Sequence, residues 1–236
     1  MNLHRVSSVV LSAVAALSLV ASAQAAIVVT NLGFEADILA DGADSWPTAP
    51  TGWTAINNSS VGLSAVKNPF PLDSPQAIDN NFGYLYAENN GAAISLYQQV
   101  DTGFAANTTY TFQVLVGDLK KASDPAQFPF PDTVVLGIYN GTTNSGGALT
   151  DVLAVNTITG PGDGLAAYYT VNYTTGALAP LGPVVIGMSV TNSQSLTNNL
   201  KLATFDDVTV AVPEPASLGA LVGAAGLVAL RRRRGQ

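Results

Sequence analysis

The sequence predicts an all-β protein in which two antiparallel sheets pack face to face around one core. Helix signals are nearly absent between residues 27 and 210, whereas Gly, Asn, Thr and Pro recur throughout. Short runs rich in β-branched and aromatic residues alternate with these turn residues at spacings typical of sandwiches. The chain has 236 residues, and its central region is long enough to enclose a hydrophobic core. A two-sheet antiparallel sandwich is the simplest architecture that satisfies all three observations.

The strands are predicted in order from alternation and composition. The clearest covers residues 110–116, where every second side chain is aromatic or β-branched and falls on one face. Residues 169–174 alternate in the same way, with Tyr and Val on one face and Thr and Asn on the other. Six further runs have strand composition: 82–87, 94–100, 134–139, 152–158, 184–190 and 203–210. Turn-rich links lie between them, including Asn140-Gly141, 144–147 and 160–164.

Residues 1–25 are predicted to be a signal peptide that forms an N-terminal helix. His4 and Arg5 precede an apolar run over residues 6–20, and small residues suited to cleavage follow. The run is shorter than the roughly 20 residues that a membrane span needs. We therefore expect cleavage, with a permanent N-terminal anchor as the alternative, and a sandwich domain over residues 26–211.

Residues 212–236 form a second apolar end. Pro213, Glu214 and Pro215 precede the apolar stretch 216–230. The chain then closes with a basic cluster, Arg231, Arg232, Arg233 and Arg234. As a helix, the apolar stretch would reach about 22 Å against a hydrocarbon core of about 30 Å, which makes a short transmembrane helix. The arginines would hold its end on the cytoplasmic side.

These three elements, in this order, resemble the PEP-CTERM sorting signal of Gram-negative bacteria. The resemblance implies recognition by an exosortase-type sorting protease and a transient tether in the inner membrane. It also implies later delivery to the cell surface or extracellular matrix, in organisms that commonly make extracellular polysaccharide. A permanent C-terminal anchor is the alternative.

The charge is unevenly distributed along the chain. The net charge of the whole chain is −7, but residues 26–212 hold four lysines against fifteen acidic residues, which gives −11. This region contains no Arg, His or Cys. It therefore has no basic stripe for nucleic acid and no group for triad or thiolate chemistry. Contact with a polysaccharide would depend on aromatic rings, hydroxyls, amides or bridging calcium.

Four short motifs occur in order along the central region: Asn31-Leu32-Gly33-Phe34-Glu35, Gly52-Trp53, Tyr97-Gln98-Gln99-Val100 and Phe205-Asp206-Asp207-Val208. Together they resemble galactose-binding-like jelly-roll domains, including several families of carbohydrate-binding modules. The resemblance implies jelly-roll connectivity, neighbouring first and last strands, and Trp53 as a core residue. A shared sandwich does not by itself fix a ligand.

The same resemblance implies a structural calcium ion between the first and last strands. The matching residues are Glu35 and either Asp206 or Asp207. Calcium takes six to eight oxygen ligands, so backbone carbonyls or the nearby Asp37, Asp41 and Asp44 would have to contribute. The alternative is that these carboxylates are only hydrogen-bonded or solvated.

Aromatic side chains are the candidate ligand-binding residues. Trp46 lies in a turn-like stretch, and Tyr84 and Tyr86 fall on one face of a strand, where rings could stack on a sugar. Two Pro/Phe loops contain Phe70, Phe128 and Phe130, which either close one end of the sandwich or form an apolar contact surface.

These observations favour an exported noncatalytic protein that associates with extracellular polysaccharide. One alternative is a structural component of the matrix or surface that recognises no sugar. A second is a polysaccharide-processing enzyme that uses two carboxylates. The only glutamates available to it are Glu35 and Glu88. We expect no catalytic residues and no cofactor other than calcium.

Overall fold

The computed structural model describes residues 27–40, 43, 45, 48–57, 64–67, 81–87, 93–118, 129–162, 164–191 and 201–212. Within these ranges the chain forms the strands β1 (Thr54–Asn57), β2 (Ser64–Lys67), β3 (Phe82–Ala87), β4 (Ile94–Asp101), β5 (Thr109–Gly117), β6 (Thr133–Asn140), β7 (Asn144–Ser145), β8 (Ala148–Leu149), β9 (Val152–Ile158), β10 (Ala166–Thr174), β11 (Val184–Thr191) and β12 (Lys201–Ala211). All eight predicted runs are strands, and most extend by a residue or more beyond the predicted bounds.

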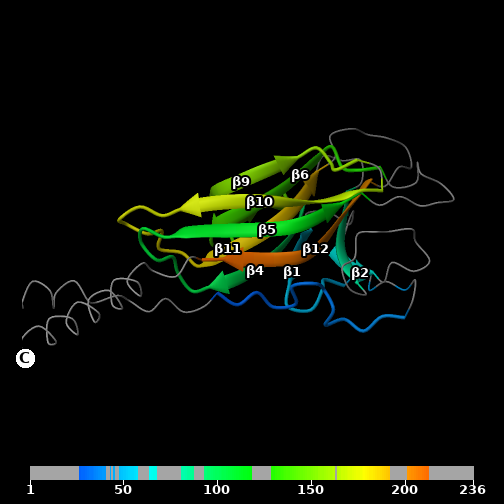
Figure 1. Cartoon of the computed structure of the whole chain (residues 1–236), viewed down its shortest axis with the longest axis horizontal. Coiled ribbons are helices and arrows are strands. Elements are labelled where there is room, and N and C mark those ends of the chain that lie inside the picture. The colour runs from blue at the N-terminus through cyan, green and yellow to red at the C-terminus, as the bar shows by residue number, and fades with distance from the viewer. Residues whose placement is uncertain are drawn as a thin grey trace, which may run out of the picture. The chain divides into compact units, whose positions relative to one another are not determined.

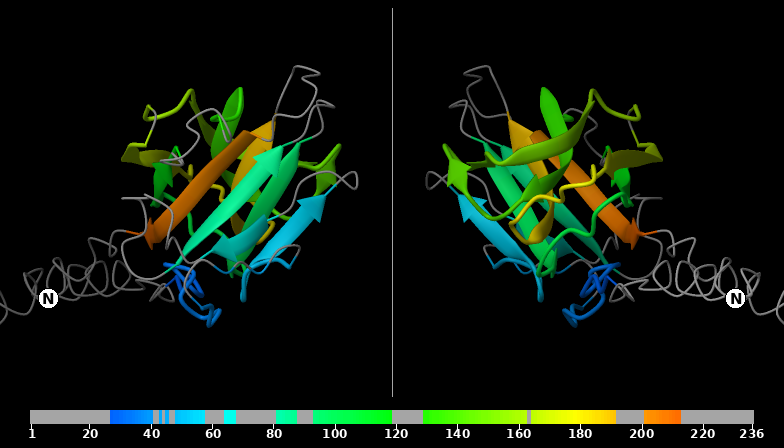
Figure 2. Two further views of the ribbon diagram at one scale, coloured as in Figure 1. Left: turned by 90° about the vertical axis from the view of Figure 1, so that its right-hand side faces the viewer. Right: turned by 90° about the vertical axis from the view of Figure 1, so that its left-hand side faces the viewer.

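The strands form two five-stranded antiparallel sheets, with the orders β1-β4-β11-β6-β9 and β10-β5-β12-β3-β2. Figures 1 and 2 show the two sheets lying one over the other as two layers. The predicted all-β sandwich is therefore confirmed. Strands adjacent in a sheet are mostly distant in sequence, so each sheet is assembled from non-local pairings.

The core lies between the two sheets. In β5, Tyr110, Phe112, Val114 and Val116 are fully buried, and the residues between them are partly exposed. This alternation matches the prediction, because successive side chains of a strand point to opposite faces. From the other sheet, Leu96, Leu136, Ile138, Ile186 and Met188 pack into the same cluster.

Strands β1, β2, β7 and β8 were not predicted. Each has four residues or fewer, which is too short for an alternating pattern to stand out from loop composition. The hairpin of β7 and β8 is tied to the start of β4: Ser95 Oγ donates to the Gly147 carbonyl at 2.7 Å, and the side chain of Leu149 is buried.

The segment 27–40 joins the four sequence motifs. The Gln98 side chain accepts from Thr30 N at 2.7 Å and donates to the carbonyls of Thr30 and Gly52. Trp53 Nε1 donates to the Asn31 carbonyl at 3.3 Å. Val208 N donates to the Leu32 carbonyl at 3.0 Å. The expected first strand is therefore an irregular segment, although it does lie beside the last strand as predicted.

Phe34 anchors this segment in the core. Its side chain is fully buried and its ring lies 5.6 Å from that of Trp53, centroid to centroid. Trp53 is itself 6% exposed, so its predicted core position is confirmed. The Phe34 ring lies against Gly83, where an added Cβ would come within 2.7 Å of Phe34 Cζ. Only a glycine leaves room for the ring at that position of β3.

Residues 27–212 form one compact unit. Among the residues described, no helix is long and apolar enough to cross a membrane. The predicted signal peptide at 1–25 and the elements of the predicted sorting signal, 213–236, lie outside the described residues.

Candidate active site

The outer face of the β10-β5-β12-β3-β2 sheet changes character along its strands. At the end where β5 begins and β10 ends, polar side chains bond in pairs across the two strands. These pairs are Thr109 with Thr174, Thr111 with Asn172, and Gln113 with Thr170. This end of the face is a hydrogen-bonded polar ladder at or near the surface, as expected for a solvated sheet face.

Farther along the same strands the outer face becomes apolar and acidic. Tyr168 is in register with Leu115 of β5, and Leu115 is in register with Asp206 of β12. The next row pairs Thr204 with Gly117 on one side and with Tyr84 on the other. Beyond it, Leu202 is in register with Tyr86. Residues in register share a face, so these side chains form one contiguous group.

This group is shielded from water although it lies outside the core. Asp206 is 2% exposed, Thr204 1% and Tyr84 6%. Leu202 is also buried, at 6% exposure. The rings of Tyr84 and Tyr86 are tilted by only 23° and lie 6.5 Å apart, centroid to centroid. The result is an enclosed surface of aromatic and aliphatic side chains with a carboxyl group among them.

A bulge in β12 places two carboxyl groups side by side. The register with β5 shifts between Asp206 and Thr209, and Asp207 adopts a positive φ of 42°. Asp207 N donates to Asp206 Oδ1 at 2.8 Å. Bulges redirect side chains and are common next to active sites. Here the bulge directs the Asp207 carboxylate toward β10.

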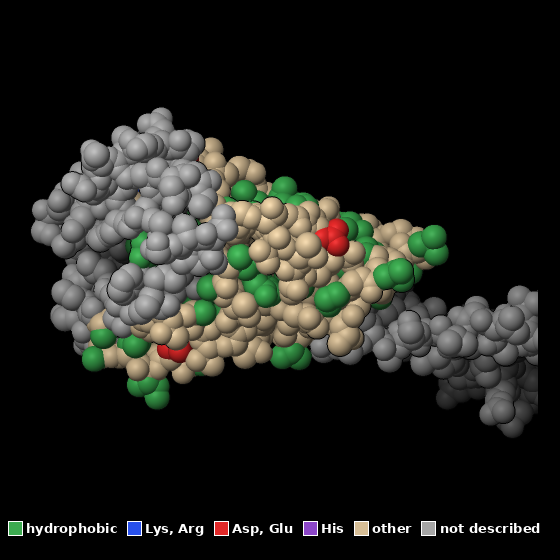
Figure 3. Space-filling model, turned by 180° about the vertical axis from the view of Figure 1, so that it is seen from behind, with side chains coloured by type: hydrophobic (Ala, Val, Ile, Leu, Met, Phe, Trp, Pro, Cys, Tyr) green, Lys and Arg blue, Asp and Glu red, His purple; other side chains and the backbone are tan. Residues whose placement is uncertain are grey.

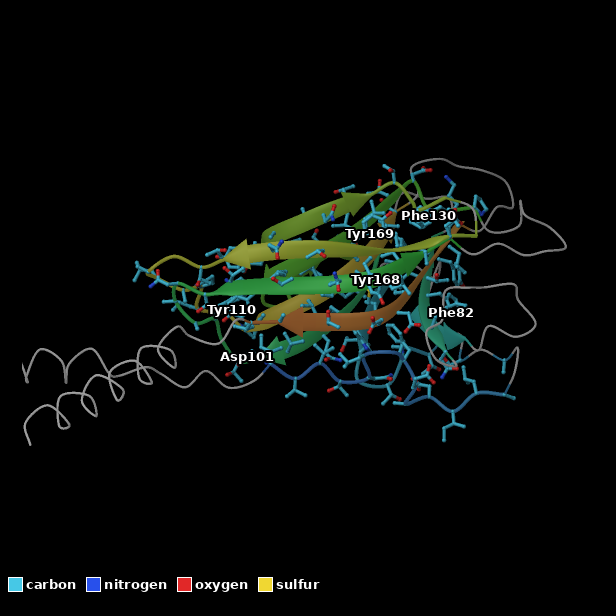
Figure 4. The ribbon with its side chains drawn as sticks, in the orientation of Figure 1. Phe82, Asp101, Tyr110, Phe130, Tyr168 and Tyr169 are labelled. Atoms are coloured by element: carbon cyan, nitrogen blue, oxygen red, sulfur yellow. The ribbon has the colours of Figure 1, made fainter. Side chains whose placement is uncertain are left out.

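Tyr168 completes the group. Its hydroxyl donates to Asp207 Oδ2 at 2.6 Å. This hydrogen bond raises the pKa of Tyr168 above its usual 10, with smaller contributions from desolvation and from the charges of Asp207 and Asp206. The phenol therefore stays protonated at neutral pH. Figure 4 shows Tyr168 on β10 in the front layer, away from the end marked by Asp101 and Tyr110.

The arrangement suits proton transfer to an apolar ligand. Asp206 is a buried carboxyl group next to a second carboxyl group, that of Asp207. Aromatic faces stabilise positive charge that develops nearby. The carboxyl groups of Asp206 and Asp207 are the acid–base groups that the described residues of this group supply.

The structure places the predicted site residues in different surroundings. Tyr84, Tyr86, Asp206 and Asp207 belong to the enclosed group. Phe130 is half-buried and packs against the core, where it lies over Gly160, at the end of the sandwich opposite to Asp101 (Figure 4). Trp46, Phe70 and Phe128 lie outside the described residues.

Glu35 lies next to a buried amide with one unsatisfied oxygen. Asn81 N donates to Glu35 Oε1 at 2.6 Å, and Asn81 Nδ2 donates to the carbonyls of Phe34 and Asp37. Asn81 Oδ1 is buried and has no hydrogen-bond partner. No three His, Cys, Asp or Glu side chains in the described part of the chain lie close enough to hold a metal ion. The calcium ligands predicted from sequence stay a prediction.

Tyr168, Leu115 and Thr204 were not predicted as site residues from the sequence. The sequence of β5 does contain a signal for Leu115. Thr109, Thr111 and Gln113 alternate with core residues, and Leu115 is the first apolar residue in that outward-facing series, which indicates that the outer face becomes apolar there. The contact between Tyr168 and Asp207 had no local signal, because it crosses an intervening strand.

Comparison with known families identifies the class of protein to which this sandwich belongs. Residues 25–211 match the HpiC1-like family, described as HpiC1 cyclase. The chain belongs to this family. Among curated proteins, none matches the sequence.

Solved structures with the same fold include cyclases from Fischerella. A Stig cyclase, Fisc, from Fischerella sp. TAU in complex with (3Z)-3-(1-methyl-2-pyrrolidinylidene)-3H-indole superposes with a TM-score of 0.62 at 19% identity, over 80% of this chain and 97% of that one. An apo cyclase from Fischerella sp. superposes with a TM-score of 0.64 at 19% sequence identity, over 80% of this chain and 96% of that one. A Fischerella sp. TAU cyclase bound to 4-(1H-indol-3-yl)butan-2-one superposes with a TM-score of 0.61 at 20% sequence identity, over 81% of this chain and 98% of that one.

These findings correct the functional prediction. The prediction of a noncatalytic polysaccharide-associated protein, and with it the prediction of no enzymatic activity, is wrong because the family is one of cyclases. Carbohydrate-binding modules of the β-sandwich superfamily are only distant structural neighbours, with a TM-score of 0.45 at 16% identity. That likeness is too low to support a sugar ligand. The galactose-binding-like resemblance predicted the sandwich but not the class of protein.

Proposed function

We propose that this chain is a cyclase that uses a proton to close a ring in an apolar aromatic substrate, on the outer face of the β10-β5-β12-β3-β2 sheet. The observation that carries the proposal is the enclosed carboxyl group of Asp206, set among Leu115, Thr204 and Tyr84 on that face. Membership of the cyclase family supports it. The two relatives with bound ligands hold indole compounds with a carbon substituent at C3, which supports a C3-substituted indole as the substrate class, and we propose that this substituent contains an alkene.

The proposed reaction is an isomerisation in which Asp206 acts as the acid. Its proton is transferred to one carbon of the alkene, and the electron pair of the alkene forms the new C–H bond. The indole ring then attacks the resulting cation, which closes the ring. A proton leaves the product and returns to the Asp206 carboxylate, so that no co-reactant is consumed. Tyr84 and Tyr86 present ring faces that stabilise the cation.

Asp207 and Tyr168 act as positioning residues in this scheme. The Tyr168 hydroxyl holds the Asp207 carboxylate at 2.6 Å, and Asp207 N in turn holds Asp206 Oδ1. The chain of bonds keeps the acid in one orientation. Tyr168 is 48% exposed, so it lies where the enclosed surface meets solvent and a substrate would enter.

Binding and turnover can be tested separately. Calorimetric titration with 4-(1H-indol-3-yl)butan-2-one is expected to show saturable binding to the purified chain. Incubation of a C3-alkenyl indole in heavy water is expected to yield an isomer with a new ring and one deuterium from the acid. Asp206→Asn should lower turnover by about 10²- to 10⁴-fold, as expected for loss of a general acid, while Asp151→Asn, an exposed acid elsewhere, should not. Turnover by Asp206→Asn at the wild-type rate would overturn the assignment.

The chain ends support a proposal about location. We propose that the protein is exported by its N-terminal signal and tethered in the inner membrane by the PEP-CTERM-like segment until an exosortase-type protease processes it. The Pro-Glu-Pro motif, the apolar stretch 216–230 and the arginine cluster support this route. Delivery to the cell surface or extracellular matrix and jelly-roll connectivity stay predictions.

We also propose a structural calcium ion at Glu35. The buried, unpaired Asn81 Oδ1 fits it, because an amide oxygen without a donor is the kind of ligand that calcium accepts. Glu35 and Asn81 would hold the ion, together with backbone carbonyls of the segment 27–40. Bound there, calcium would fix this segment to the start of β3 and would take no part in the proton transfer.

A further inference from the structure

One end of the sandwich carries two leucines that contact almost nothing. They lie in the β10–β11 loop, residues 175–183, where Leu178 is 92% exposed and Leu181 is 100% exposed. Removing apolar surface from water is favourable in proportion to the area that is buried. Two exposed leucines in one loop therefore favour contact with an apolar phase. Because the two leucines are three residues apart in one loop, they form a small apolar patch rather than a single exposed side chain.

The loop is held firmly at its base. Asn107 N donates to the Gly176 carbonyl at 2.9 Å, and Thr175 N donates to the Thr108 carbonyl at 2.9 Å. On the other side Gly182 N donates to Asn140 Oδ1 at 2.8 Å. Pro180 and Pro183 restrict the backbone between these bonds. The leucines are therefore presented by an anchored loop, and the entropy lost when they insert into another phase is small.

The same end is where the chain leaves the sandwich toward its C-terminus. Thr174 is in register with Thr109, and Ala211 with Thr111, so the start of the β10–β11 loop and the end of β12 lie at the same end of the sheet, on either side of β5. In Figure 1 the arrowheads of β10 and β12 point to this end. Seen from the other side, hydrophobic side chains protrude at the narrow end of the molecule (Figure 3).

We propose that this end, through Leu178 and Leu181, contacts the surface of the lipid bilayer while the chain is tethered by residues 216–230. The inference rests on the proposed tether. The chain from Val212 to Ala216 is too short to hold the sandwich far from the membrane, since each extended residue adds at most about 3.6 Å. The end that reaches the membrane first is the one that carries the exposed leucines.

The charges at this end indicate the kind of lipid. Asp101 and Asp151 are the acids near the loop: Asp151 accepts from Asn140, and Asp101 follows β4 into the neighbouring turn. The described side chains near the loop include no lysine or arginine. Contact therefore depends on apolar insertion and favours zwitterionic over anionic lipid, because anionic headgroups repel these carboxylates. The enclosed group with Asp206 lies farther along the sheet, away from the two leucines.

The absence of cysteine allows a direct test on the full chain. Leu178→Cys, Leu181→Cys, Ile38→Cys and Ala224→Cys are each labelled with an environment-sensitive fluorophore, and the chain is reconstituted in phosphatidylcholine vesicles that contain nitroxide-labelled lipid. Ile38 is the matched control, because it is 97% exposed in a different loop. Ala224 lies in the apolar stretch and reports the tether.

We expect lipid quenching at positions 178 and 181 to be severalfold stronger than at 38, with strong quenching at 224. Quenching at 224 together with equal, weak quenching at 178, 181 and 38 would overturn the contact and leave the tether standing. No quenching at 224 would overturn both. A further variant combines Leu178→Ser and Leu181→Ser with Ala177→Cys, which carries the fluorophore. We expect this variant to show no lipid quenching at position 177. Quenching that persists there would contradict the role of the leucines.

Discussion

The Tyr168 hydroxyl on β10 reaches across β5 and donates to the Asp207 carboxylate of β12 at 2.6 Å. This bond joins two strands that are not neighbours in the sheet, because β5 lies between them. It can form because the bulge in β12 gives Asp207 a positive φ and turns its side chain toward β10. The positive φ of Asp207 costs backbone strain, and the hydrogen bond from Tyr168 offsets part of that cost. Both residues lie next to Asp206, the proposed acid.

Tyr168→Phe removes this bond without removing the ring. Loss of a hydrogen bond to a charged group corresponds to about a ten- to hundredfold decrease in the rate of ring closure if the bond positions the acid. The melting temperature should change little, since the side chain is half exposed. The measurement is kcat and KM for the C3-alkenyl indole, with the decrease expected in kcat. Tyr173→Phe on the same strand is the control. An equal decrease in kcat for that variant would show that the hydroxyl of Tyr168 has no specific role.

A second prediction concerns stability at high pH. Burial raises the pKa of Tyr139 from 10 to about 12. Above pH 10 the unfolded chain releases this proton while the folded chain keeps it, so the free energy of unfolding falls as pH rises toward 12. The shift corresponds to about 3 kcal/mol lost across that window. Below pH 10 the group contributes no pH dependence.

Tyr139→Phe should flatten this alkaline decrease while the neutral stability stays near that of the wild type. The ring packs against Gly137 and Gly187, where an added side chain would collide with it, and Phe keeps that packing. Chemical denaturation at pH 8, 10 and 11.5 measures the effect. An alkaline slope that is the same in both proteins would show that Tyr139 is not its source.

The third prediction tests the link between the sequence motifs. Gln98→Leu keeps the size of the side chain but leaves Thr30 N and the carbonyls of Thr30 and Gly52 without their partner. Unpaired polar groups in a partly buried site predict a loss of about 2–4 kcal/mol in the free energy of unfolding. Gln99→Leu, on the exposed face of the same strand, should cost much less. Urea denaturation of both variants measures the two losses. A similar loss in Gln99→Leu would show that β4 tolerates substitution poorly in general and that the hydrogen bonds of Gln98 have no special role.

Local sequence patterns predicted the sandwich but not the site. Strand β5 was predictable because its alternation is strict, and the core position of Trp53 followed from the resemblance to galactose-binding-like domains. The Tyr168–Asp207 contact was not, because it depends on the strand order β10-β5-β12 and on a bulge, both of which are set by distant pairings. The lack of His, Cys and Arg in residues 26–212 favoured the prediction of a noncatalytic protein. It did not exclude an enzyme, since proton-driven ring closure needs only one enclosed carboxyl such as Asp206.

The last prediction concerns calcium. If Glu35 and Asn81 hold the ion, saturating calcium should raise the melting temperature by about 5–10 °C over the chelated protein, because a ligand at about 100 times its Kd adds about 2.7 kcal/mol and each kcal/mol corresponds to about 2–4 °C for a domain of this size. Asn81→Ala should melt lower in both conditions, since Asn81 also bonds to Phe34 and Asp37. The informative quantity is therefore the difference between calcium and chelator, which should vanish in Asn81→Ala and persist in Asp151→Asn. A wild-type melting temperature that chelation leaves unchanged would exclude the site, and the unpaired Asn81 oxygen would then need another partner.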